Sequence, residues 1–302
     1  LIEKVGGIGA MTEKRGSLAD YLFYDANLDS RNIEILWRAN YVTNYDLESQ
    51  NFPPSLFGNG EVNPTQNFVD AFPMANGYPI TDIVNSQYDE DAPYTGRDPR
   101  LTDYVIYNGA KFKNVNINTS VDDPKDGLNV LTTSTRTGYY LKKLLREDVN
   151  LNPAAGRQHF RPLIRYTELF LIYAEAANEA YGADNANTAG FSARQAIRAI
   201  RQRAGVGGTT ETSDEYLNSL TNLRDIIRNE RRIELSFEGF RFWDIRRWGN
   251  SLNETAKGIK YQGTLYELID VENRIFAPYM QYGPIPSDQI TKTKNLEQNA
   301  GW

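Results

Sequence analysis

The side chains best suited to chemistry are concentrated in residues 224–249, which hold seven arginines, no lysine and five carboxylates. Arginine used without lysine favours forked, bidentate pairing with carboxylates over a solvated run of charge. Such a segment could bind an anion or a phosphate, or it could form a buried ion-pair network that fixes a helix and the turn after it. We favour the network, because the same segment supplies five anions to its seven cations.

Paired carboxylates are also the catalytic groups of glycoside hydrolases. Glu230, Glu234 and Glu238 follow one another at intervals of one helical turn. A general acid needs a raised pKa, whereas neighbouring arginines hold a carboxylate ionised and lower its pKa. The segment is therefore a poor candidate for catalysis, and we expect no catalytic residues in it.

The composition removes most other chemistries. The chain has no cysteine and one histidine, His159, so it can form no disulfide, zinc finger, iron–sulfur cluster or thiol nucleophile. No G-x-S-x-G elbow, complete dinucleotide fingerprint or P-loop is present, and we interpret His159 as an ordinary structural or exposed histidine. The acidic loops at 89–91 and 122–126 lack the spacing of an EF-hand. We expect neither a metal site nor a cofactor.

Charge and hydropathy narrow the range of partners. The formal net charge is −6, which argues against nucleic acid as a partner, because proteins that bind it attract phosphates with a basic surface. No stretch of about 18 apolar residues could span a membrane. The chain begins at Leu1 without an initiator methionine or signal peptide, so we expect that either its N-terminus has been removed or it is a fragment, and its start indicates little about location.

Aromatic side chains in loops are the remaining candidates for ligand contact. Aromatic faces stack on the C–H faces of sugars, while amides and charged groups at the rim bind the hydroxyls. For the aromatic residues of the loop 43–64, stacking on a sugar and packing within the loop are equally favoured. For the aromatic residues of the strand 32–41, we favour a position in the core. The candidate glycan-binding residues are Trp37, Asn44, Tyr45, Phe52, Phe57, Asn59, Tyr88 and Tyr94.

The first half of the chain, 1–160, is predicted to be rich in loops and short strands. Apolar residues alternate with polar ones over 32–41, which is the period of a half-buried strand. The Asn108-Gly109 pair predicts a hairpin that joins a strand at 104–107 to a strand at 111–116.

The second half, 161–249, changes to a helical period. We expect a helix over 162–181 ended by Gly182, and a second over 193–204 that begins at a Ser192…Gln195 capping box. Small residues along the first helix leave room for the second, as in a tetratricopeptide-type hairpin. A third helix is expected at 222–237. Because one hairpin rarely makes a stable array, we also expect further helices upstream of this chain.

Ordered blocks along the chain give it a recognisable signature. The longest are residues 223–235 (LRDIIRNERRIEL) and 237–249 (FEGFRFWDIRRWG). Shorter blocks are 63–66 (NPTQ), 69–72 (VDAF), 96–101 (GRDPRL), 137–140 (TGYY), 164–169 (IRYTEL), 173–176 (YAEA), 200–206 (IRQRAGV), 284–286 (PIP) and 295–302 (NLEQNAGW). In this order they resemble the SusD/RagB family, glycan-capturing outer-membrane lipoproteins of Bacteroidetes.

The resemblance implies a mainly α-helical, SusD-like fold: tetratricopeptide-type helix pairs plus irregular segments with short β-hairpins. We expect one SusD-like domain over 1–302, with an extended tail at 250–302, as the C-terminal portion of a longer protein. The family implies no catalysis and no cofactor. Its members bind oligosaccharide or polysaccharide at the cell surface and serve a SusC-like, TonB-dependent transporter; they touch the membrane only through an N-terminal lipid anchor. The alternatives are uptake of peptide or another nutrient on the same fold and, less favoured, glycoside hydrolysis.

Overall fold

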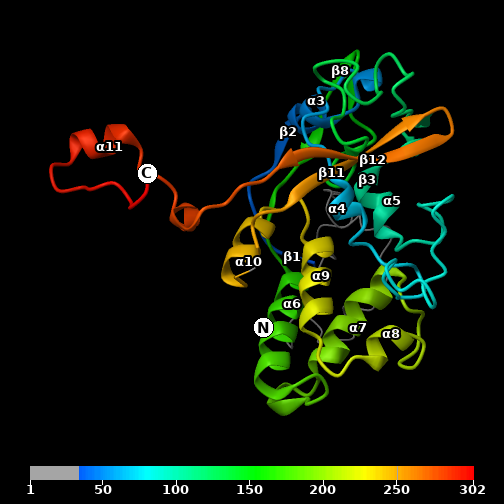
Figure 1. Cartoon of the computed structure of the whole chain (residues 1–302), viewed down its shortest axis with the longest axis vertical. Coiled ribbons are helices and arrows are strands. Elements are labelled where there is room, and N and C mark those ends of the chain that lie inside the picture. Colours follow the sequence, from blue (N-terminus) through cyan, green and yellow to red (C-terminus); the bar gives the residue numbers. More distant parts are fainter. Residues whose placement is uncertain (1–33, 250) are drawn as a thin grey trace.

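The computed structural model describes residues 34–249 and 251–302. Figure 1 shows two parts of one body, with packed helices below and irregular chain with short strands above. The helices are α3 (Asp46–Asn51), α4 (Gln66–Val69), α5 (Arg100–Tyr104), α6 (Tyr166–Tyr181), α7 (Ala193–Ala204), α8 (Glu215–Ser219), α9 (Arg224–Glu234), α10 (Arg241–Arg247) and α11 (Ser287–Lys292), with 3-10 turns η3 (Pro54–Leu56), η4 (Asn187–Ala189) and η5 (Pro278–Gln281).

The helical part confirms the predicted pair α6 and α7, except that residues 162–165, expected to begin the first helix, form β10 because they pair with β1. Ser192 accepts a hydrogen bond from the Gln195 backbone and its own N–H is bound by the Gln195 side chain, so the capping box starts α7 at Ala193. Gly205 ends α7 at a φ of 83°, a left-handed conformation that suits glycine. Glycine at 182 likewise ends α6. These ends were predictable because each depends only on residues a few positions apart.

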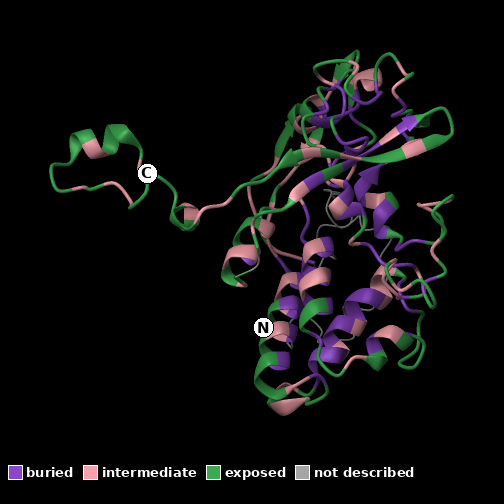
Figure 2. Cartoon of the chain, in the orientation of Figure 1, coloured by how far each residue is buried: buried purple, intermediate pink, exposed green. Residues whose placement is uncertain are grey.

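Three helices bury one common core. Phe170 and Ala174 of α6, Ile197 of α7 and Ile227 of α9 are all fully buried and belong to the same cluster. The alanine lets the helices approach closely. Burying each isoleucine or phenylalanine contributes roughly 2–3 kcal/mol. In Figure 2 the buried residues face one another across these helices.

The strands are short and form two-stranded ribbons. They are β1 (Ile35–Arg38), β2 (Val42–Asn44), β3 (Val105–Ile106), β4 (Lys111–Phe112), β5 (Val115–Asn116), β6 (Tyr140–Leu141), β7 (Asn150–Leu151), β8 (Ala154–Ala155), β9 (Arg157–His159), β10 (Pro162–Arg165), β11 (Thr255–Gln262) and β12 (Leu265–Asn273).

Of the strand predicted over 32–41, the structure has β1 at 35–38, and a second strand, β2, begins only after the predicted end, at 42. β1 pairs with β10 and β2 pairs with β9, both antiparallel, so residues 35–44 run along residues 157–165. Ala39 donates to the Arg161 carbonyl at 2.9 Å between the two ladders. Residues 32 and 33 lie outside the described residues. Residues 35–44, paired with residues 157–165, form a long ribbon, which we call the β1/β2 ribbon.

The predicted hairpin at Asn108-Gly109 is wrong in its pairing. The turn exists, since Ala110 donates to the Tyr107 carbonyl at 2.9 Å. However, β3 pairs with the distant β6, and β4 pairs with β5. Val105 and Ile106 are fully buried, so burial in the core decides their pairing, which the local turn chemistry did not reveal.

The segment 250–302, expected to be an extended tail, contains a long hairpin. β11 and β12 pair antiparallel, and Ile259 and Tyr261 of β11 are buried against the upper core. Gly138 permits this contact, because a Cβ at this position would lie 2.2 Å from the Ile259 carbonyl oxygen. Only the chain after β12, with α11, extends away from the body (Figure 1).

Candidate functional site

The arginine-rich segment forms a closed ion-pair network, as favoured above. Glu230 and Glu234 of α9 are fully buried. Arg100 donates through Nη1 to both carboxylates, at 2.9 and 3.1 Å. Arg201 pairs with Glu230 at 3.2 Å, and Arg203 with Glu234 at 2.5 Å. The cations that bind Glu230 and Glu234 come from α5, α7 and β10, which corrects the expected local pairing for these two carboxylates. Within the segment, Arg231 pairs with Asp244 at 2.9 Å.

Catalysis by these carboxylates finds no support in their environment. Burial alone would raise the pKa of Glu234, but Arg203, Arg165 and Arg100 outweigh it and lower the pKa to about 2. A general acid requires the opposite shift. The anion-site alternative is weakened in the same way: Arg100, Arg201 and Arg203 are engaged by these glutamates, and Arg231 and Arg247 of the segment itself pair with Asp244.

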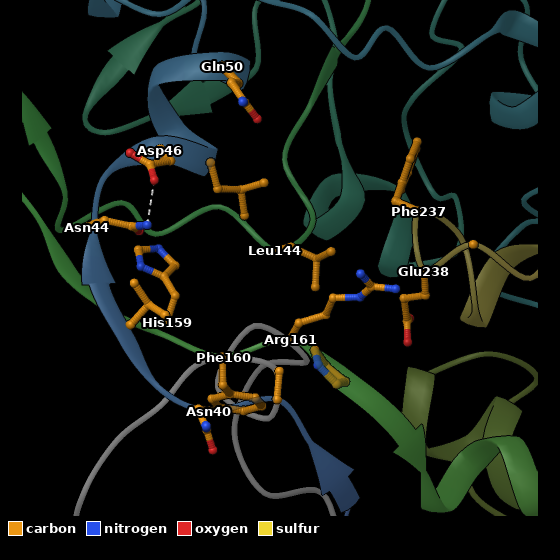
Figure 3. Close-up of a pocket in the computed structure, with 15 residues that line it drawn as sticks. Asn40, Asn44, Asp46, Gln50, Leu144, His159, Phe160, Arg161, Phe237 and Glu238 are labelled. Atoms are coloured by element: carbon orange, nitrogen blue, oxygen red, sulfur yellow. Dashed lines mark hydrogen bonds between the residues drawn. The ribbon is translucent and has the colours of Figure 1, made fainter. Parts of the chain in front are cut away.

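A different region offers an accessible cavity of about 650 Å³ (Figure 3). It lies among the β1/β2 ribbon, α3 and the chain that follows α9. Its lining is mixed, with polar groups of both charges and two aromatic rings. The lining residues are Ala39, Asn40, Val42, Asn44, Asp46, Leu47, Gln50, Leu144, His159, Phe160, Arg161, Pro162, Phe237, Glu238 and Gly239.

One wall of the cavity comes from β2 and α3. Asn44 ends β2, and Asp46 and Gln50 lie four residues apart on α3, a spacing that places side chains on one face of a helix. Asn44 Nδ2 donates to Asp46 Oδ2 at 2.7 Å. This wall therefore presents amide and carboxylate oxygens and amide N–H groups.

His159 enters the cavity wall through the register of the ribbon, which pairs it with Val42. Its Nε2 lies 2.9 Å from Oε1 of the buried Glu48, and its Nδ1 lies 2.8 Å from the Arg157 carbonyl. The hydrogen bond to Glu48 raises the pKa of His159, more than burial lowers it. With both ring nitrogens engaged, His159 is a structural ion pair and is not available as a catalytic base.

The opposite wall contains a carboxylate that is already neutralised. Glu238 Oε1 accepts from Lys143 Nζ at 2.7 Å and from Arg165 Nη2 at 2.9 Å, and its Oε2 accepts from Arg165 Nε at 2.7 Å. Burial would raise the pKa of Glu238, but Lys143 and Arg165 lower it. The positive φ of 62° at Phe237 turns the chain here, so that Phe237 and Glu238 both line the cavity.

Arg161 contributes a second charge to this side of the cavity. It precedes β10, is exposed, and points into the cavity near Glu238 (Figure 3). Among the residues that the structure describes, its guanidinium has no ion pair or hydrogen bond. In this respect it differs from the arginines that surround α9.

The eight predicted glycan-binding residues have different positions. Asn44 lines the cavity, and its neighbour Tyr45 is 41% exposed beside it. Phe52 is wrong as a ligand contact: its side chain is fully buried and packs edge-on against Phe112 at 5.3 Å. Phe57 is 62% exposed and Asn59 is exposed, but neither lines the cavity, so their roles stay predictions.

Trp37 does not occupy the core position that we favoured for it. It is 62% exposed, because β1 belongs to a two-stranded ribbon and no element of the described part of the chain covers the outer face of this residue. Tyr88 is half-buried, and the centre of its ring lies 5.4 Å from the guanidinium carbon of Arg97. Tyr94 stacks on Tyr107 at 4.0 Å and its hydroxyl lies 3.2 Å from that of Tyr139. Neither tyrosine lines the cavity.

Most residues that line the cavity were not predicted from the sequence. The missed polar residues come from three distant stretches of chain and are Asn40, Asp46, Gln50, His159, Arg161 and Glu238. No motif joins them, and the pairing of β1 with β10 and of β2 with β9 brings the first two stretches together. Within 34–249 and 251–302, no cluster of three potential metal-ligating side chains occurs, and no helix is long and apolar enough to cross a membrane.

Comparison with known proteins defines the class. Residues 26–302 match the sequence profile of the SusD family, and the chain belongs to that family. A SusD-like protein from Bacteroides fragilis has a TM-score of 0.73 at 25% identity, over 98% of this chain and 61% of that one. A SusD-like carbohydrate-binding protein from the same organism gives 0.72 at 27% identity, over 96% and 61%. The predicted SusD-like fold class is thereby confirmed.

Curated relatives agree over shorter stretches. SusD-like protein P38 of Formosa agariphila is 30% identical over 130 residues, which are 43% of this chain and 23% of the relative. SusD-like protein P25 of the same organism is 28% identical over 151 residues, 50% of this chain and 26% of the relative. The chain spans about three fifths of the solved relatives named above.

Proposed function

We propose that this chain is a non-catalytic, glycan-binding part of a surface uptake system. It would capture oligosaccharide or polysaccharide at the outer membrane and pass it to a TonB-dependent transporter of the SusC type. The cavity between α3 and the β1/β2 ribbon carries the proposal. Its volume of about 650 Å³ suits a small ligand or a segment of a longer one.

The chemistry of the cavity fits a sugar. Asn44, Asp46 and Gln50 offer the donors and acceptors that hydroxyl groups require, and the rings of Phe160 and Phe237 offer apolar faces. Membership of the SusD family supports the same ligand class, since one solved relative is described as a SusD-like carbohydrate-binding protein.

Affinity electrophoresis against a panel of neutral and acidic polysaccharides tests the proposal. We expect retardation on at least one polysaccharide, and loss of most of it in Asn44→Ala. Asn295→Ala is the matched control, because Asn295 is an exposed amide outside the cavity, and Asn59→Ala tests the other predicted position. An unchanged Asn44→Ala with a weakened Asn59→Ala would move the site to the loop after η3.

Two further assays separate the alternatives. Binding to a random peptide library without binding to any polysaccharide would replace the glycan proposal by peptide uptake on the same fold. Release of reducing sugar that disappears in Glu234→Gln would instead favour hydrolysis. We expect neither result, because Glu234 is fully buried and its pKa is lowered to about 2.

A further inference from the structure

The two walls of the cavity differ in the charge that remains available. Arg161 and His159 are the basic side chains that line it. His159 is bound to Glu48 and to the Arg157 carbonyl, whereas Arg161 has no partner among the described residues. One guanidinium is therefore free to bind a group from outside.

Glu238, the acidic residue on the same side, does not satisfy this guanidinium. Both of its carboxylate oxygens accept hydrogen bonds from Lys143 and Arg165, whose side chains are 1% and 2% exposed. If Glu238 turned to Arg161, the buried Lys143 would lose its carboxylate partner and Arg165 would lose one of its three, which makes that exchange costly. Arg161 thus stands beside a compensated carboxylate and makes no ion pair with it.

Across the cavity, the charge has the opposite sign. Figure 3 shows Asn44 and Asp46 on one side and Arg161 with Glu238 on the other. Asp46 is exposed and accepts a hydrogen bond from the Asn44 amide. A carboxylate suits sugar hydroxyls and repels an anion, so the Asp46 wall and the Arg161 wall should select different groups of one ligand.

We infer that the cavity takes an acidic glycan in one orientation, with its carboxylate or sulfate on Arg161 and its hydroxyls on Asp46 and Asn44. This inference rests on the proposed glycan-binding function and adds to it the charge of the ligand. A guanidinium binds a planar carboxylate or a sulfate through two parallel N–H donors, which lysine cannot do with the same geometry.

Matched ligands test the charge directly. Calorimetry would compare oligogalacturonates with their methyl esters, and sulfated with desulfated galactan oligosaccharides, to separate a carboxylate from a sulfate. We expect at least one acidic form to bind about ten-fold or more tightly than its neutral counterpart, in line with a charge-assisted pair. In Arg161→Gln that preference should fall to less than about two-fold, and Arg161→Lys should restore part of it.

Two variants provide controls. Arg274→Gln removes an exposed arginine outside the cavity and should leave both affinities unchanged. Asp46→Asn should weaken acidic and neutral forms together, because it alters hydroxyl binding and not the anion contact. Circular dichroism would confirm that each variant is folded.

The possible failures are distinguishable. Equal binding of the acidic and neutral forms, or a preference that survives in Arg161→Gln, would overturn the inference and leave glycan binding in place. Binding to neutral polysaccharides alone has the same consequence. Absence of binding to every polysaccharide of the panel would count against the proposed function, and the inference would fall with it.

Discussion

Two regions of this molecule contain arginines beside glutamates, and they use them differently. Around α9, Arg100, Arg201 and Arg203 bind Glu230 and Glu234 at 2.5–3.2 Å, and all of these side chains are at most 8% exposed. At the cavity, Arg161 is exposed and unpaired among the described residues. The density of charge is higher around α9, yet Arg100, Arg201 and Arg203 are already bound there by the two glutamates.

The difference shows that charge in the sequence is a poor guide to a binding site. What matters is whether the fold satisfies each charged group internally. A buried carboxylate with three guanidinium partners mainly holds helices together, whereas an exposed guanidinium with none can exchange water for a ligand. If this contrast holds, variants around α9 should lose stability, whereas a variant at Arg161 should keep it.

Glu234→Ala should lower the free energy of unfolding by about 5 kcal/mol, since it leaves buried cations without their counter-ion. Urea unfolding followed by circular dichroism measures this loss. The lowered pKa of Glu234, about 2, also predicts a pH dependence. A carboxylate with a depressed pKa contributes stability above its ordinary pKa of about 4.3, and that stability is lost as the pH falls towards 2. A loss below about 1 kcal/mol would contradict the role of the network.

Phe52→Ala should cost about 4 kcal/mol, because it opens a cavity in the core where Phe52 packs on Phe112. Phe57→Ala, five residues along the same loop, should change the free energy of unfolding by less than about 0.5 kcal/mol, because Phe57 is 62% exposed. Thermal unfolding of the two variants side by side gives the comparison. Similar losses in both would mean that the loop packs differently from the structure.

His159→Gln should destabilise the protein by about 1 kcal/mol at pH 6, a value for a charged hydrogen bond at a partly solvated site. The raised pKa of His159 determines how the stability contributed by its ion pair changes with pH. Its contribution is complete below the ordinary histidine pKa of about 6.5 and is lost as the pH rises through the higher pKa of the folded protein. The variant should thus converge with the wild type at alkaline pH. Parallel urea titrations would detect this; a constant difference at all pH values would contradict the ion pair with Glu48.

Arg161→Gln should change the free energy of unfolding by less than about 0.5 kcal/mol, because its guanidinium makes no hydrogen bond or ion pair within the described part of the chain. The informative control is Arg203→Gln, which breaks a buried pair with Glu234. Urea unfolding of both variants tests the contrast between the two regions. A large loss in Arg161→Gln would show that Arg161 belongs to the network, and would remove the basis for anion binding.

Local features of the sequence predicted the helical part well. The capping box at Ser192 and the glycine at 205 determine where α7 begins and ends, and each acts over a few residues. The closed network was predictable in kind but not in its partners. Arg100 lies 130 residues before Glu230 in the sequence, and nothing in either segment specifies the other.

The cavity could hardly be predicted, because residues far apart in the sequence form it together. Asn44 was proposed because of its loop, but His159 and Arg161 reach it only through the register of β2 on β9. Phe52 shows the converse error. Its surroundings of proline, glycine and asparagine are typical of an exposed loop, whereas the fold buries its ring completely against Phe112.

The position of Arg161 in the β1/β2 ribbon has a consequence for the thermodynamics of binding. Pro162 follows it and restricts its backbone to extended conformations, and its carbonyl accepts from Ala39 at 2.9 Å. Four residues later, Arg165 is fixed in the network by Glu238 and Glu234. The guanidinium is thus carried by a preorganised backbone, and a ligand would need to order only a side chain. Conformational entropy should oppose binding here less than in a flexible loop.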